Sequence, residues 1–62
     1  MNKQLIAATL LASQVYGPEA GVKPRKLAGV WYVELPPHPR RQEVAAAFGR
    51  ADVMVLAEIR QG

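Results

Sequence analysis

An apolar stripe with the three-to-four spacing of a helix runs along the first sixteen residues. Its members are Leu5, Ala8, Ala12 and Val15, widened by Ile6, Leu10 and Leu11. Asn2 suits the N-cap position, and Gly17 followed by Pro18 ends the pattern. We therefore expect an amphipathic helix that begins after Asn2, with a Gly/Pro connector over residues 17–21. The same segment has the outline of a secretory signal, but its apolar run is too short to span a bilayer, so no membrane partner is expected.

Residues 22–35 have the pattern of a β-hairpin. The second arm, residues 30–35, is rich in β-branched and aromatic residues, and Ala28-Gly29 lies where a two-residue turn would be. Pro24 cannot donate to a ladder, so the first arm must be an edge strand or irregular. This turn position pairs Lys26 with Trp31, Arg25 with Tyr32 and Lys23 with Glu34. The residues predicted to face the core are Trp31, Val33 and Leu35.

The rest of the chain predicts a second helix and a third strand. Residues 36–39, Pro-Pro-His-Pro, break regular structure, and Pro39 suits the first position of a helix that extends to about Phe48, with Gly49 at its end. Residues 52–59 form a short apolar run that periodicity cannot assign. We favour a strand there, because a third strand lets two helices cover one sheet; a helix is the alternative.

The predicted fold is a single α+β domain over residues 1–62, in the order helix-strand-strand-helix-strand. Its sheet has three strands, mainly antiparallel, with two helices on one face. The expected core is Leu5, Ala8, Leu11, Val15, Trp31, Val33, Leu35, Val44, Phe48, Val53, Val55 and Ile59.

Composition limits the means by which so short a chain is stabilised. A chain of 62 residues buries a modest core, and the absence of cysteine excludes disulfides and thiolate metal sites. One histidine cannot build a metal site unless carboxylates help, so we expect neither metal nor cofactor. Packing must stabilise the fold, alone or with a homodimer as the alternative. A cysteine-free chain also fits a reducing, cytoplasmic compartment.

Signals for catalysis are nearly absent. The sequence has no Gly-rich phosphate loop, no His-Glu-x-x-His and no nucleophile motif. His38 lies between prolines, and spacing identifies no partner for it as a general acid or base. We therefore expect a protein that is not an enzyme.

Two short segments resemble DNA-binding families. Lys26–Val33, KLAGVWYV, resembles the wing of excisionase-type winged-helix proteins, although no recognition helix precedes it. Residues 41–60 resemble a helix-turn-helix at Val44, Ala45, Phe48, Gly49 and Val55, and that resemblance implies that residues 52–59 are helical.

Positive charge is concentrated in the middle third of the chain. The net charge is +3, and residues 23–41 carry five cations against Glu34. The candidate binding residues are Lys23, Arg25, Lys26, Tyr32, Arg40 and Arg41. Cations with an adjacent aromatic suit phosphate backbones and stacked bases, so we favour a regulatory or accessory protein that binds nucleic acid. The alternative is a phage- or mobile-element-type inhibitor that binds a host protein with an acidic face, since Tyr and Arg are typical hot-spot residues.

Overall fold

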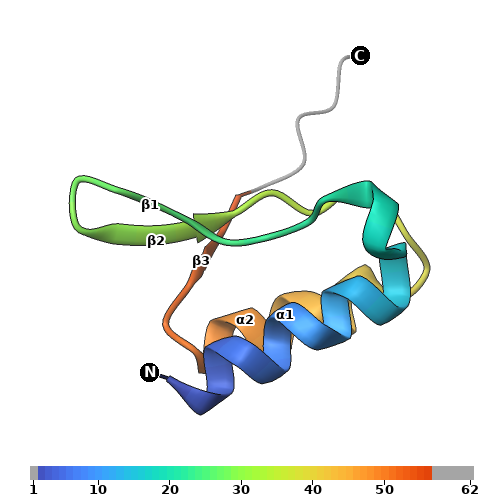
Figure 1. The fold of residues 1–62 in the computed structure, drawn as a ribbon, viewed down its shortest axis with the longest axis horizontal. Coiled ribbons are helices and arrows are strands. Elements are labelled where there is room, and N and C mark those ends of the chain that lie inside the picture. Colours follow the sequence, from blue (N-terminus) through green and yellow to red (C-terminus); the bar gives the residue numbers. More distant parts are fainter. Residues whose placement is uncertain (1, 57–62) are drawn as a thin grey trace.

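Two helices lie on one face of a three-stranded sheet in the computed structural model, which describes residues 2–56 (Figure 1). The elements are α1 (Lys3–Tyr16), η1 (Pro18–Ala20, a short 3₁₀ turn), β1 (Arg25–Leu27), β2 (Val30–Val33), α2 (Arg41–Arg50) and β3 (Met54–Val55). This arrangement confirms the α+β class and the predicted order of helices and strands. None of the helices within residues 2–56 has the length and apolar character needed to cross a membrane.

Helix α1 has the predicted ends. The Asn2 side chain accepts a hydrogen bond from the Gln4 N–H at 2.9 Å, which satisfies one of the free donors of the first turn. At the other end the Gly17 N–H donates to the Ser13 carbonyl, and Gly17 takes a φ of 90° that favours glycine. The chain then turns through η1, so the connector is partly ordered by a 3₁₀ turn.

The hairpin has the predicted register. Arg25 pairs with Tyr32 and Lys26 pairs with Trp31 across antiparallel strands. Ala28 and Gly29 both have positive φ, 52° and 80°, which is the type I′ turn that suits a two-residue hairpin. The ladder does not extend to the predicted pair of Lys23 and Glu34, because β1 begins at Arg25 and β2 ends at Val33.

Strand β3 joins β2 in parallel, so the sheet is mixed with the order β1-β2-β3. Helix α2 connects these two strands as a crossover, and a crossover returns the chain in the same direction. A hydrogen bond from the Leu56 N–H to the Val33 carbonyl continues the pairing. The strand predicted within residues 52–59 is thus present at Met54–Val55, and residues 57–59 lie outside the described residues. A strand here contradicts the helix-turn-helix resemblance.

Helix α2 differs from the prediction at both ends. It begins at Arg41, because Pro39 and Arg40 form a turn before it. It ends beyond Gly49 in a Schellman motif, in which the Val53 N–H donates to the Phe48 carbonyl and the Asp52 N–H to the Gly49 carbonyl. Asp52, with a φ of 60°, takes the left-handed position. The prediction that α2 ends at Gly49 is therefore wrong.

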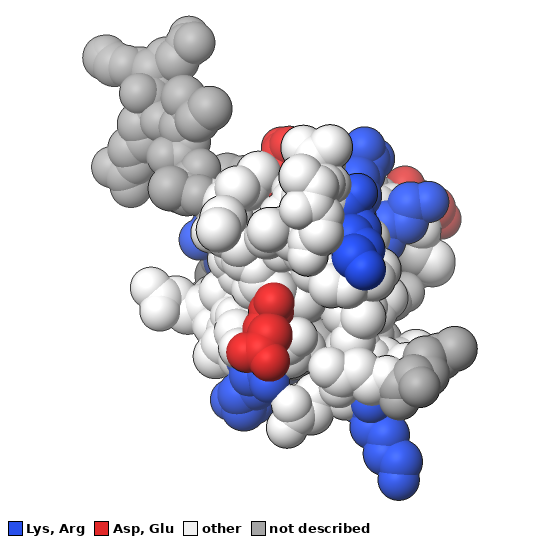
Figure 2. All heavy atoms as spheres, turned by 90° about the vertical axis from the view of Figure 1, so that its left-hand side faces the viewer, with Lys and Arg blue, Asp and Glu red and all other residues white. Residues whose placement is uncertain are grey.

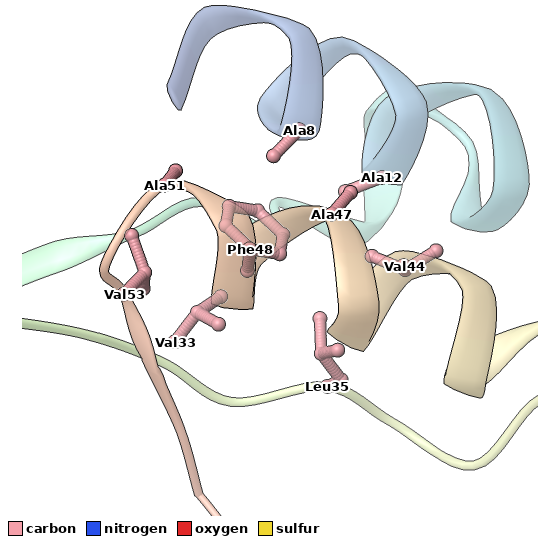
Figure 3. Close-up of a cluster of buried hydrophobic side chains, with 9 residues drawn as sticks. All are labelled: Ala8, Ala12, Val33, Leu35, Val44, Ala47, Phe48, Ala51 and Val53. Carbon is pink, nitrogen blue, oxygen red and sulfur yellow. The ribbon is translucent and has the colours of Figure 1, made fainter. Parts of the chain in front are cut away.

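Alanines bring the two helices together over the core. Ala8 and Ala12 of α1 are directed toward α2, where Ala47 and Phe48 are buried (Figure 3). The remaining buried residues are Val33, Leu35, Val44, Ala51 and Val53. Because small side chains occupy the contact, the predicted core residues Leu5, Leu11, Val15 and Val55 flank it and are only partly buried. Ile59 lies outside the described residues.

Trp31 was wrongly predicted to be buried. The Trp31 side chain lies on the sheet face that is turned toward the helices, as expected, but 37% of the residue is exposed. The β1–β2 turn projects past the end of the helix layer (Figure 1), so Trp31 lies nearer the uncovered tip than Val33 does. Burial on this face therefore depends on how far the helices reach along the hairpin.

Candidate interaction surface

The hairpin register divides the candidate binding residues between two faces of the sheet. Lys26 and Trp31 are cross-strand neighbours on the face toward the helices, whereas Arg25 and Tyr32 are neighbours on the outer face. Both helices lie on the inner side (Figure 1), so no described element covers the outer face.

Three exposed cations and three exposed apolar residues form what we call the hairpin surface. Its members are Lys23, Arg25, Lys26, Leu27, Val30 and Trp31. Among residues 2–56, neither Lys23 nor Arg25 forms an ion pair. Figure 2, which looks onto the end of the molecule where the turn lies, shows Lys and Arg side chains along one side of its upper part, beside uncharged atoms and some Asp or Glu atoms. The hairpin surface therefore combines apolar area with cations, of which Lys23 and Arg25 form no ion pair among residues 2–56.

Lys26 lies over the indole of Trp31. Its Nζ is 5.8 Å from the ring centroid, within the range of a cation–π interaction. At an exposed site such a contact contributes about 0.5–1 kcal/mol. The contact holds one positive charge beside the most exposed aromatic ring of the hairpin, on the inner face of the sheet.

Arg40 is placed away from the hairpin and has a partner. Its guanidinium donates to both carboxylate oxygens of Glu43 across the first turn of α2. These hydrogen bonds are the largest cause of the lowered pKa of Glu43 and the raised pKa of Arg40. Because both groups are exposed, the ion pair adds little to stability. The Glu43 carboxylate compensates the positive charge of Arg40, so this charge is less available to a ligand.

Arg41 is bound within the fold. Its Nε donates to the Leu35 carbonyl at 3.1 Å, and its second terminal nitrogen donates to the Leu56 carbonyl at 3.0 Å. These two carbonyls lie just beyond the ends of β2 and β3. Arg41 thus joins α2 to both strands. The candidate binding residues that remain, Lys23, Arg25, Lys26 and Tyr32, lie on or beside the hairpin, with Lys26 on the inner face and Arg25 and Tyr32 on the outer face.

Tyr32 is half-buried on the outer face, beside Arg25 on one strand and Met54 on the other. Met54 is exposed, as are the paired Leu27 and Val30 nearer the turn. The outer face of the sheet is therefore largely apolar, with Arg25 as its cation opposite the tyrosine.

A groove separates α1 from the hairpin on the inner side. It has a volume of about 460 Å³ and is lined by Leu5, Ile6, Thr9, Leu10, Pro24 and Trp31. The one polar side chain of this lining, Thr9, donates its hydroxyl to the Leu5 carbonyl at 2.8 Å. We call this feature the α1–hairpin groove. Its floor offers apolar contact and almost no hydrogen-bonding groups.

Sequence reasoning missed the groove. Leu5 and Trp31 were assigned to the core, while Ile6 and Leu10 were treated as a widening of the helix stripe. The width of the apolar stripe was a signal for this groove. When a stripe is broader than the area that the partner helix can cover, the apolar residues at its edge stay exposed. Leu10 is 60% exposed.

His38 has partners that fix the connector before α2. Its Nδ1 accepts a hydrogen bond from the Arg40 N–H at 2.9 Å, and its ring meets that of Tyr16 edge-on at 5.2 Å. The Tyr16 hydroxyl in turn donates to the Pro36 carbonyl at 2.7 Å. These contacts attach the Pro-rich connector to the end of α1.

The fold and the surface together define a small α+β domain with a basic, apolar hairpin. Comparison with protein-family models, curated proteins and solved structures found no match to this chain.

Proposed function

We propose that this chain is a small, non-enzymatic accessory or regulatory protein whose hairpin surface binds an acidic face of a partner protein. The observation that carries the proposal is that each face of the hairpin places an exposed cation beside exposed apolar residues: Lys26 beside Trp31 on the inner face, and Arg25 on the same outer face as Leu27 and Val30. Complementary charge steers a partner onto such a surface and fixes its orientation, while desolvated apolar and aromatic contacts supply most of the affinity.

The apolar share of the surface supports a protein target over a nucleic acid. Leu27 is 68% exposed at the tip of the hairpin, and Val30 opposite it is also exposed. Phosphate backbones offer such side chains no apolar contact, whereas a protein face does. The roles of Arg40 and Arg41 within the fold further reduce the positive charge available to a phosphate backbone.

The contacts of His38 support a function without catalysis. Its Nδ1 accepts a hydrogen bond from the Arg40 N–H, and its ring packs edge-on against Tyr16. His38 therefore helps to fix the connector before α2. A general base needs a lone pair directed at substrate, and this lone pair is directed at the Arg40 N–H.

Single-stranded nucleic acid is the second candidate target, on a specific observation. Tyr32 lies opposite Arg25 on an outer sheet face that no described element covers. A ring beside a cation on an open sheet can stack a base and contact its phosphate.

Affinity capture with paired charge variants tests the proposal. The immobilised chain is exposed to nuclease-treated extract of its source cells, and retained proteins are quantified. We expect Lys23→Gln/Arg25→Gln to reduce retention of a specific protein at least about tenfold, because two steering charges are removed. The control Arg40→Gln/Arg50→Gln removes the same charge from the N-cap and the last turn of α2 and should leave retention unchanged.

Two results would contradict a protein target. Equal retention by both variants would show that the hairpin cations do not steer binding. Nucleic acid retained without nuclease, weakened steeply by salt and lost with Tyr32→Ala, would favour the second candidate.

A further inference from the structure

The α1–hairpin groove has the size and lining of a site for inserted apolar side chains. Its volume of about 460 Å³ is within the range of ligand grooves, on the order of 300–1,000 Å³. Ile6, Leu10 and Trp31 are exposed along it although each belongs to a helix or strand. Because Thr9 already donates to a backbone carbonyl, the lining favours an apolar occupant over a polar one.

The segments that line the groove are exclusively basic among their charged residues. Residues 3–10 and 22–33 contain Lys3, Lys23, Arg25 and Lys26 and no Asp or Glu; of these cations, Arg25 lies on the outer face of the sheet, away from the groove. Lys26 lies directly over the Trp31 ring that forms one wall. An occupant with carboxylates around an apolar face would meet both the floor and the cations, whereas a basic occupant would be repelled.

From this combination we infer that the groove binds the apolar face of an acidic amphipathic segment of a partner protein, an inference that rests on the proposed function. An amphipathic helix enters such a groove with anchors three or four positions apart, and its carboxylates flank the anchors. The hairpin surface and the groove share Trp31, and Lys26 lies over its ring, so one partner segment can engage both.

A second copy of the chain is a poorer occupant on the same argument. Its net charge is +3, and its own groove would bring Lys26, and Lys3 and Lys23 of the lining segments, to the interface. Like charges facing each other across an interface oppose association. The cations of the lining segments therefore favour an acidic partner, although the apolar floor alone would accept either an acidic partner or a second copy of the chain.

Selection from a displayed library of random peptides against the full chain tests this inference. We expect the enriched peptides to carry Asp or Glu around two or more large apolar residues at helical spacing. Leu10→Gln should raise their Kd at least about tenfold, because it places an amide on the apolar floor. Met54→Gln is the matched control: Met54 is 56% exposed against 60% for Leu10, and it lies outside the groove lining.

The outcomes separate the groove from the hairpin surface. Peptides lost on Lys23→Gln/Arg25→Gln but retained on Leu10→Gln would overturn the groove and leave the proposed function standing. Peptides retained by both variants would overturn both. Enriched peptides without carboxylates, no enrichment at all, or self-association that Leu10→Gln abolishes would also overturn an acidic occupant.

Discussion

Arg25 and Arg41 carry the same side chain but meet different surroundings. Arg41 donates two hydrogen bonds to backbone carbonyls beyond the ends of β2 and β3, and it is half-buried. Arg25 is exposed and forms no ion pair with the rest of residues 2–56. A guanidinium that satisfies internal carbonyls stabilises the fold, whereas an exposed one is available to a partner. Sequence position alone did not distinguish these roles.

Ala28 is a second residue whose conformation matters more than its type. Its φ of 52° is left-handed, where a Cβ costs roughly 1–2 kcal/mol, and Asn tolerates this region better. We expect Ala28→Asn to raise the free energy of unfolding by about 1 kcal/mol, measured by urea denaturation. The control Ala46→Asn, on the exposed side of α2, should lower it by about 0.5 kcal/mol. A loss of stability with Ala28→Asn would contradict the type I′ turn.

At the level of elements, the contact of α1 with α2 depends on small side chains. Ala8 and Ala12 are fully buried there, and larger residues of α1 flank the contact (Figure 3). Alanine lets helix backbones approach closely, which leaves no space for additional methylenes. The same close approach leaves Ile6 and Leu10 at the exposed edge, where they contribute to the groove.

A larger side chain at this contact should be costly. Ala12→Leu must push the helices apart or force a strained rotamer, so we expect a loss of about 1–3 kcal/mol in the free energy of unfolding. Ala7→Leu places the same side chain on the exposed side of α1 and should change stability by less than about 0.5 kcal/mol. Urea denaturation measures both variants. Similar losses for the two would show that α1 does not pack on α2 through Ala12.

Local signals predicted the elements better than they predicted burial. The Asn2 cap, the Gly17 stop and the Ala28-Gly29 turn are determined by residues close in sequence, and each is present. The left-handed residue that follows α2, Asp52, was missed because a left-handed Asp is rarer than Gly in that position. The burial of Trp31 was misjudged because its exposure depends on where another element stops, and the periodicity of the sequence carries no information on that.

On the scale of the whole molecule, the hairpin and the helix layer are offset along the long axis of the molecule. The turn of the hairpin extends beyond the helices (Figure 1), and the hairpin surface occupies this projection. The candidate site was predicted in its hairpin part, which comes from one contiguous segment. Its other half, the groove, needs α1 beside β2, and that long-range contact could be inferred only after the layers were known.

The position of Trp31 gives the molecule its own optical probe. It is the sole tryptophan of the sequence, and its indole is partly in water at the wall of the groove. A ligand that displaces this water should shift the emission to shorter wavelength without any attached dye, while one on the outer face of the sheet should leave the spectrum unchanged. Titration of the native chain can therefore show which side of the sheet a partner occupies.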